Sequence, residues 1–280
     1  MTNLNIDIKS LPNNIEKFVI SILNLKPPYC YGFINSLELN NVVIKTKNKF
    51  KNYENMITNK LIKSIRASFM RNFMMFNHKN LTINSKNIYS DYKNDIDVLD
   101  ISKKYNVSPL NLLRDIFFKK YKEKLTKLIL DKNSLSSYDL KQLNIAIKND
   151  AYSLVNQDSI LYESLKFEKK VEEFLKINNI KFKTQEQLVK EQIKLYNKPI
   201  NTPDFYILSD LYINNNKINW IDAKNFYGAN TKFINYNIKK QTKKYINEFG
   251  SGSIIFNLGF NEKLQFNNIL IIDYISIKDN

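Results

Sequence analysis

Two aspartates and a lysine in the C-terminal half of the chain have the residue types and spacing of a phosphodiester-hydrolysing site. Asp204 begins the strand-like part of NTPDFYILSD (201–210), and Asp222 and Lys224 close the run INWIDAK (218–224). Two neighbouring carboxylates can hold a hard divalent cation, which polarises a phosphate, while a nearby ammonium group orients water or neutralises developing charge. Each acid alone could equally be an ordinary solvated residue at a strand end.

The predicted secondary structure brings these residues together. Side chains two apart on a strand share a face, so Asp222 and Lys224 should point the same way, opposite to Ile221. The run of asparagines at 214–216 predicts a hairpin turn between the two strands. An antiparallel hairpin would place Asp204, at the start of one strand, close to Asp222, near the end of the other.

The amino-acid composition limits which metal ion and which kind of partner the protein could bind. The 280-residue chain has one cysteine, Cys30, and one histidine, His78, which excludes an internal disulfide and a Cys/His zinc site. Any metal must be held by carboxylates, which favours Mg²⁺ or Mn²⁺. The net charge of +16 favours a nucleic acid partner, although an anionic membrane surface would satisfy the same electrostatics.

Targeting and membrane signals are missing from the sequence. It contains no apolar run of about 18 residues and no basic-plus-apolar leader. We therefore expect a soluble, intracellular protein of the nucleus or cytoplasm that acts without a membrane.

The C-terminal half alternates helices with strands. Helices are predicted at 159–180 and 234–249, the second ending at Gly250, and VKEQIKLYNKPIN (189–201) is expected to form a surface loop. Runs rich in β-branched and aromatic residues predict strands at 180–185, 204–209, 217–224, 253–260 and 269–277. The order is αβββαβ with a further strand, which predicts a mixed α+β or α/β domain around a central sheet.

The first 150 residues are expected to be all helical. Apolar residues recur at helical spacing within 53–77, which predicts an amphipathic helix. The residues between them are basic: Lys60, Lys63, Arg66 and Arg71. This basic face is either solvated or in contact with phosphates.

Residues 95–121 predict a helix, a short turn and a second helix. Ser108 is expected to cap the second helix, with Pro109 in its first turn. Helix-turn-helix DNA-binding units have this pattern, and Asn111 and Arg114 are the exposed groups of the second helix that could read bases. Plain helical hairpins have the same pattern.

A polar, Ser/Asn-rich segment at 131–160 is the predicted domain boundary. It divides the chain into a helical region, 1–150, and a C-terminal domain, 158–280. Because the segment lacks a long Gly/Pro linker, we expect the two parts to pack together.

The C-terminal motifs resemble those of the PD-(D/E)xK nuclease superfamily, with Pro203-Asp204 as "PD" and Asp222-Ala223-Lys224 as "(D/E)xK". Within it, three strings are similar to the TPD-motif family typified by the codanin-interacting nuclease: TPD (202–204), WIDAKNFYG (220–228) and NEFGSGSIIFNLGF (247–260). The resemblance is clear over about 160–275 and implies a restriction-endonuclease-like core.

The resemblance also implies roles for single residues. Asp204 and Asp222 would bind the metal and Lys224 would act on the attacking water or the transition state. Glu168 would be an additional metal-holding acid and Gln241 a glutamine near the phosphate, although both could be solvated helix residues. The family typically has Glu-Ser-Lys where this chain has Asp222-Ala223-Lys224, so the first acid is one methylene shorter.

These observations predict a Mg²⁺- or Mn²⁺-dependent nuclease that hydrolyses DNA, with branched or structured DNA among the candidate substrates. A second hypothesis keeps the nuclease fold as a catalytically weak scaffold or nucleic-acid-binding module that acts through a codanin-like protein partner. A third is a helix-turn-helix regulator without catalysis. No oligomeric state is predicted.

Overall fold

A computed structural model describes residues 1–152 and 157–278, with 157–160 as backbone only. Its contacts divide the chain into two compact units. Unit one comprises Met1–Ser21, Val43–Ser68 and Ser159–Asn280, and unit two comprises Ile22–Val42 and Phe69–Asp158. Residues 153–156 of the predicted boundary segment and 279–280 of the predicted C-terminal domain lie outside the described residues.

This division differs from the predicted one at the N-terminal end, because two early segments belong to the same unit as the C-terminal half. The amide of Leu11 donates to the carbonyl of Phe260 (2.8 Å), and the amide of Tyr227 donates to Ser64 Oγ (2.8 Å). The N-terminal region is also not all helical. Strand β1 (Thr2–Leu4) pairs in parallel with β4 (Leu211–Ile213). Helical periodicity could not have indicated this pairing or the two hydrogen bonds.

Unit one is built on a five-stranded mixed sheet of order β2-β3-β6-β7-β8. Its strands are β2 (Phe182–Thr184), β3 (Phe205–Ile207), β6 (Trp220–Lys224), β7 (Gly252–Phe256) and β8 (Ile269–Asp273). β2, β3 and β6 pair antiparallel, whereas β6, β7 and β8 pair parallel. The mixed sheet and the α+β class are therefore as predicted, with the last strand shorter because α12 (Tyr274–Lys278) follows it.

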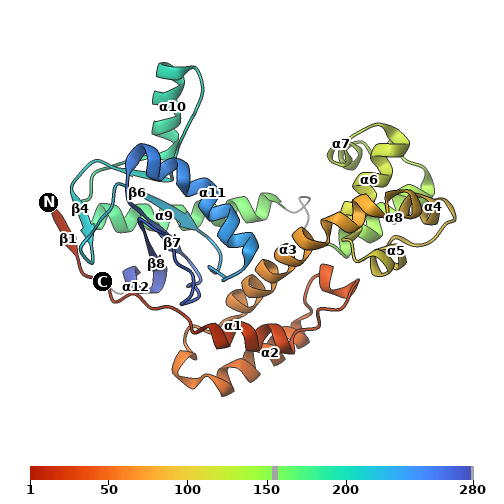
Figure 1. Ribbon diagram of the computed structural model, residues 1–280, viewed down its shortest axis with the longest axis horizontal. Coiled ribbons are helices and arrows are strands. Elements are labelled where there is room, and N and C mark those ends of the chain that lie inside the picture. The colour runs from red at the N-terminus through yellow and green to blue at the C-terminus, as the bar shows by residue number, and fades with distance from the viewer. Residues whose placement is uncertain (153–156, 279–280) are drawn as a thin grey trace. The chain divides into compact units, whose positions relative to one another are not determined.

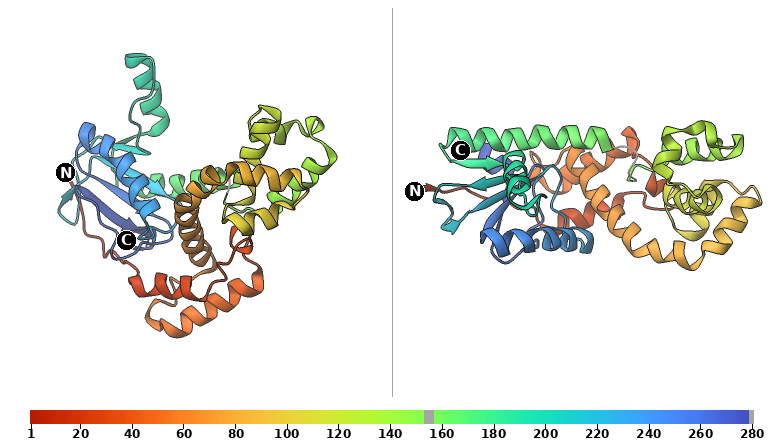
Figure 2. Two further views of the ribbon diagram at one scale, coloured as in Figure 1. Left: turned by 45° about the vertical axis from the view of Figure 1, so that its right-hand side comes forward. Right: turned by 90° about the horizontal axis from the view of Figure 1, so that it is seen from above.

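Two long helices cover the two faces of this sheet. α9 (Gln157–Ile177) packs Phe167, Val171 and Leu175 against Ile221 and the neighbouring strands. α11 (Lys232–Phe249) lies on the other face and connects β6 to β7. Figure 2 shows the resulting three layers, with the sheet between α9 and α11. A parallel pair needs such a crossover, so the β6-α11-β7 unit follows from the strand directions.

The asparagine turn belongs to a different hairpin from the predicted one. It joins β4 to β5 (Asn216–Lys217), and these two strands form a second sheet with β1. Asn214 and Asn215 have φ angles of 47° and 64°, which matches the positive φ at both central residues of a tight hairpin turn. β3 and β6 still pair antiparallel, but this small hairpin lies between them in the chain (Figure 1).

The expected surface loop at 189–201 is mostly helical. α10 (Gln185–Tyr196) extends away from the sheet (Figure 1) and begins with a capping box formed by Thr184 and Gln187. Thr-x-x-Gln satisfies two amides that would otherwise lack partners at the helix start. That motif was present in the sequence as a helix-start signal.

The remaining helices are contributed by residues 13–148. Their bounds are α1 (Asn13–Ile22), α2 (Ser36–Lys49), α3 (Asn59–Ile83), α4 (Ser85–Lys93), α5 (Val98–Tyr105), α6 (Pro109–Tyr121), α7 (Leu125–Leu130) and α8 (Ser137–Lys148). The predicted helix 53–77 corresponds to α3. Its basic face is smaller than expected, because Arg66 is buried at 4% exposure. Along the described chain, no helix has the length and apolar character needed to cross a membrane.

The core of unit two lies between α4, α5, α6, α7 and α8. α5 and α6 confirm the predicted helix–turn–helix, with Asn106 in the left-handed conformation between them. Ser108 is the N-cap residue and Pro109 follows in the first turn, as predicted, but the Ser108 side chain accepts no capping hydrogen bond. Instead, the amide of Leu110 donates to the buried Asp150 carboxylate (3.1 Å), a long-range contact that local sequence does not encode.

Candidate active site

The pairing of β3 with β6 brings Asp204 and Asp222 together. Phe205 is in register with Ile221, so the residue before β3 lies opposite Asp222. Asp204 Oδ2 accepts a hydrogen bond from the amide of Ala223 (2.7 Å), directly beside the second acid. The predicted juxtaposition is present, although the intervening chain takes a longer route than a simple hairpin.

Asp222 and Lys224 point to the same side of β6, as the strand period predicted. Their side chains form an ion pair in which the Asp222 residue is 1% exposed and the Lys224 side chain is 17% exposed. Beyond this ion pair, Asp222 Oδ2 accepts no hydrogen bond from the described residues. Burying two charges is costly unless they are paired, so this contact holds both side chains in place.

Gln241 on α11 connects the two charged groups. Its Oε1 accepts a hydrogen bond from Lys224 Nζ (3.0 Å), and its Nε2 lies 3.4 Å from Asp222 Oδ1. The side-chain amide thus offers an acceptor to the cation and a donor to the anion. Gln241, one of the predicted residues, therefore lies in contact with both Asp222 and Lys224.

Tyr245 was missed by the sequence reasoning. Its hydroxyl accepts from Gln241 Nε2 (3.2 Å) and donates to the carbonyl of Thr202 (3.3 Å). Burial, followed by the Asp222 charge, raises the pKa of Tyr245 to about 12, so the hydroxyl keeps its proton at neutral pH. The spacing of four residues from Gln241, which puts both on one helix face, was the available signal.

The pKa values of Asp204 and Lys224 are both raised, but for different physical reasons. Burial, and then the charge of Asp222, raises the pKa of the Asp204 carboxyl well above its ordinary value. Burial alone would lower the pKa of Lys224, but the charge and hydrogen bond of Asp222, together with the charge of Asp204, outweigh burial, and the pKa lies above the ordinary lysine value. Lys224 is therefore a cation at neutral pH.

Glu168 on α9 faces the same group of charges. Burial and then the Asp222 charge raise the pKa of its carboxyl, and the Lys224 charge opposes them. Glu168 and Asp204 line one hollow of about 440 Å³ together with Thr184 and Gln185. All five predicted site residues thus lie in one region of unit one.

The donor atoms suit a hard divalent cation. Carboxylate oxygens are the ligands that Mg²⁺ and Mn²⁺ prefer, and the Asp222 carboxylate is close enough to Asp204 and Glu168 that its charge raises the pKa of both. Among the described side chains, those of residues 1–152 and 161–278, no three His, Cys, Asp or Glu groups already form a metal-binding group. A bound cation would share Asp222 with the Lys224 ammonium.

A tryptophan fixes the strand that carries the site. The Trp220 ring packs on Tyr245, with 5.3 Å between ring centroids, and its Nε1 donates to the carbonyl of Gly250 (2.9 Å). A Cβ atom on Gly252 would lie 2.1 Å from the Trp220 ring, so only glycine leaves room at that position. This packing sets the distance between β6 and α11.

Exposed cations follow one side of α11 beside the site. Thr231 caps the helix through the amide of Ile234, and Gly250 ends it with a φ of 80°. Five lysines between these ends are exposed: Lys232 in the first turn, and Lys239, Lys240, Lys243 and Lys244 on either side of Gln241 in the sequence. The four that flank Gln241 could meet a polyanion that approaches the carboxylates.

A family model described as "Protein of unknown function TPD sequence-motif" matches residues 136–275, half of the chain. The chain belongs to this family. The matched TPD region contains Asp204, Asp222, Lys224, Gln241 and Glu168, as well as Tyr245.

Related proteins extend the likeness beyond the matched TPD region. An uncharacterized protein of Acanthamoeba polyphaga mimivirus is 28% identical over 273 residues, which cover 93% of this chain and 83% of the viral protein. No solved structure gives a significant match.

Proposed function

We propose that this TPD-family chain is a divalent-metal-dependent nuclease that hydrolyses phosphodiester bonds in DNA. The observation that carries the proposal is the convergence of Asp204 and Asp222 at neighbouring strands, with Lys224 held between Asp222 and Gln241. The order of α9, β2, β3, β6, α11 and β7 along the chain also fits the PD-(D/E)xK core that the motifs resemble.

Asp204, Asp222 and Glu168 would hold the cation. When bound, Mg²⁺ or Mn²⁺ supplies positive charge that polarises the phosphate and lowers the pKa of water. The raised pKa of Asp204 fits this role, because burial, and then repulsion by Asp222, disfavours the charged carboxylate until a cation is present.

Lys224 would act as a charge and a hydrogen-bond donor, not as a base. Its raised pKa keeps the ammonium protonated at neutral pH. Gln241 and Asp222 fix its position, so the group needs little reorganisation to stabilise negative charge that develops on a phosphate oxygen. The exposed lysines of α11 would hold the flanking phosphates.

One observation favours the alternative of a catalytically weak nuclease-fold scaffold. The Asp222 carboxylate is already neutralised by Lys224 without any metal. A closed ion pair could keep the fold intact while a nucleic acid or a codanin-like protein partner is bound elsewhere on the chain.

Cleavage assays decide between the two. The full chain with Mg²⁺ or Mn²⁺ is incubated with linear, flapped and four-way DNA and with RNA, alongside the double variant Asp204→Ala, Lys224→Ala. We expect cutting of at least one DNA form that the variant abolishes. Failure on every substrate would remove the nuclease proposal, and equal cutting by the variant would identify a contaminant.

A further inference from the structure

Unit two contains a cavity of about 690 Å³ that is separate from the carboxylate site. α3, α6 and α7 supply most of its lining, and its apolar part consists of Met74, Leu81, Leu110, Phe118, Leu125 and Ile129. The volume is within the range of about 300–1,000 Å³ that is typical of small-molecule and cofactor sites. A cavity of this size with an apolar floor can enclose a ring system.

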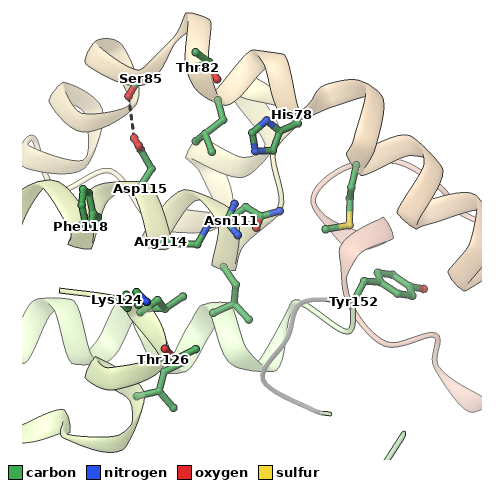
Figure 3. A pocket seen from close by; sticks show the side chains of 15 residues that line it. His78, Thr82, Ser85, Asn111, Arg114, Asp115, Phe118, Lys124, Thr126 and Tyr152 are labelled. Carbon is green, nitrogen blue, oxygen red and sulfur yellow. Dashed lines mark hydrogen bonds between the residues drawn. The ribbon is translucent and has the colours of Figure 1, made fainter. Parts of the chain in front are cut away.

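The polar groups of the cavity come from one stripe of α6 and from the elements opposite. Asn111, Arg114 and Phe118 are spaced three and four residues apart, so they share a face of the helix. Figure 3 shows His78 of α3 above Asn111 and Arg114, with Lys124 and Thr126 below them. The two groups that the sequence suggested for base reading therefore face a hollow.

The charge that the cavity offers is positive. Arg114 and Lys124 are exposed and make no ion pair with another described residue. The acid of the lining, Asp115, is already bound by Lys119 (2.6 Å) and by the Ser85 hydroxyl (2.9 Å). An incoming anion would therefore meet two available cations, one of them a guanidinium suited to phosphate.

We propose that this cavity binds an unpaired nucleotide, with its base on the apolar floor beside Phe118 and its phosphate at Arg114 and Lys124. Phe118 is 57% exposed, so its ring is available for stacking. Asn111 presents both a donor and an acceptor for a base edge. The nucleotide could be free or part of a single strand, and the chain's charge of +16 favours the strand.

The shape of the cavity disfavours duplex DNA as the ligand. A recognition helix must protrude to enter a major groove about 12 Å wide. Here the stripe of α6 lies in a hollow that α3 and α7 also line, so a duplex would meet those neighbours first. A single unstacked nucleotide is small enough to enter. This inference goes beyond the proposed nuclease activity and does not depend on it.

Binding of the full chain to a labelled single strand, measured by fluorescence anisotropy in EDTA, tests the cavity without metal-dependent cleavage. We expect Phe118→Ala to weaken binding by about 5- to 160-fold, which corresponds to the 1–3 kcal/mol typical of one stacked base. Phe118→Trp should preserve binding, and Arg114→Ala with Lys124→Ala should weaken it and reduce its salt dependence. Lys103→Ala, an exposed lysine of α5 outside the cavity, is the matched control and should have no such effect.

A cross-linking experiment locates the contact. A bromodeoxyuridine strand irradiated on the wild-type chain should label the tryptic peptide Asp115–Lys119, which contains Phe118. A mononucleotide that displaces the strand and its cross-link would also support the proposal and identify a free nucleotide as sufficient. Variants are compared only after circular dichroism shows an unchanged melting curve, and the Phe118→Trp chain keeps the test valid if Phe118→Ala unfolds.

Several outcomes would overturn the proposal. Unchanged affinity in the Phe118 and Arg114 variants would do so, as would equal weakening of duplex and single-strand binding. Protection of the cavity by an acidic apolar peptide, with no nucleic acid cross-link there, would assign the site to a protein partner instead. None of these results bears on whether unit one cleaves DNA.

Discussion

The carboxylate site of unit one and the cavity of unit two present their charges in opposite ways. Asp222 is buried and Lys224 is half-buried, and the two are paired with each other and held by Gln241. Arg114 and Lys124 are exposed at the rim of an apolar hollow. Buried charges in fixed geometry suit a chemical step, whereas exposed charges above an apolar floor suit binding. Substitutions at the carboxylate site should therefore affect both stability and catalysis, whereas substitutions in the cavity should affect binding alone.

The largest expected effect is at Lys224. Lys224→Met leaves the Asp222 carboxylate buried without its cation, which should cost about 3–5 kcal/mol of unfolding free energy. Cleavage should fall by about 100- to 1,000-fold because a donor to the reacting phosphate is lost. Urea denaturation and initial cleavage rates measure the two effects.

Lys190→Met is the matched control for that substitution. Lys190 pairs with Glu186 four residues away, and its side chain is 69% exposed, so the change should cost no more than about 1 kcal/mol. Equal losses in the two variants would contradict the contrast between a buried and an exposed ion pair.

Divalent cation should stabilise the chain only through the carboxylate site. At 100 times its dissociation constant, Mn²⁺ should add about 2.7 kcal/mol to the unfolding free energy. Asp204→Ala should abolish the gain and Arg114→Ala should keep it. Calorimetric melting with and without Mn²⁺ measures the gain, and an equal gain in Asp204→Ala would remove Asp204 from the proposed ligands.

The pH dependence of stability should show the raised pKa of the Asp204 carboxyl. Its pKa is higher in the folded chain than in the unfolded chain, so the folded state binds more protons between those two values. Stability therefore falls as pH rises through that window, with a slope of at most about 1.4 kcal/mol per pH unit for one proton. The Asp204→Asn variant should lack this slope, so its unfolding free energy should increase relative to that of the wild type as pH rises. Urea denaturation in EDTA across pH measures it, and parallel curves would contradict the raised pKa.

Loss of the Tyr245 hydroxyl should have a smaller effect. Tyr245→Phe keeps the packing on Trp220 but removes the hydrogen bonds of the hydroxyl to Gln241 and to the Thr202 carbonyl, so about 1 kcal/mol of Gln241 positioning is lost. We expect cleavage to fall about fivefold, with Mn²⁺ affinity unchanged. A matching loss of Mn²⁺ affinity would indicate that Tyr245 acts on the carboxylates themselves.

The smallest effects on stability should come from the cavity of unit two. Phe118 and Arg114 are exposed, so replacing either by alanine should change the unfolding free energy by no more than about 0.5 kcal/mol. Urea denaturation of both variants measures this. A loss as large as that of Lys224→Met would show that the cavity rim supports the core of unit two.

The sequence contained enough information for the centre of unit one. Strand alternation predicted the shared face of Asp222 and Lys224, and the antiparallel pairing predicted their closeness to Asp204. α10 could also have been predicted, because its Thr184 and Gln187 form a local capping signal. These features depend on neighbours in the chain.

The features that were missed depend on residues far apart in the chain. Asp150 supplies the cap of α6 from 40 positions away, and β1 joins β4 across most of the chain. The place of the asparagine turn also depended on β1, because β4 and β5 need a third strand to form a sheet. Local periodicity cannot choose among such partners.

Trp220 is the single tryptophan of the chain and stands between Gly252 and Tyr245 beside the carboxylates. Emission excited selectively at tryptophan therefore reports on unit one alone, because unit two contains no tryptophan. A red shift in that emission would indicate that α11 has moved away from Trp220 and exposed the ring to water. Comparing the emission with far-ultraviolet ellipticity during heating would separate the melting of the two units. The molecule thus carries its own spectroscopic probe next to the site where a cation is proposed to bind.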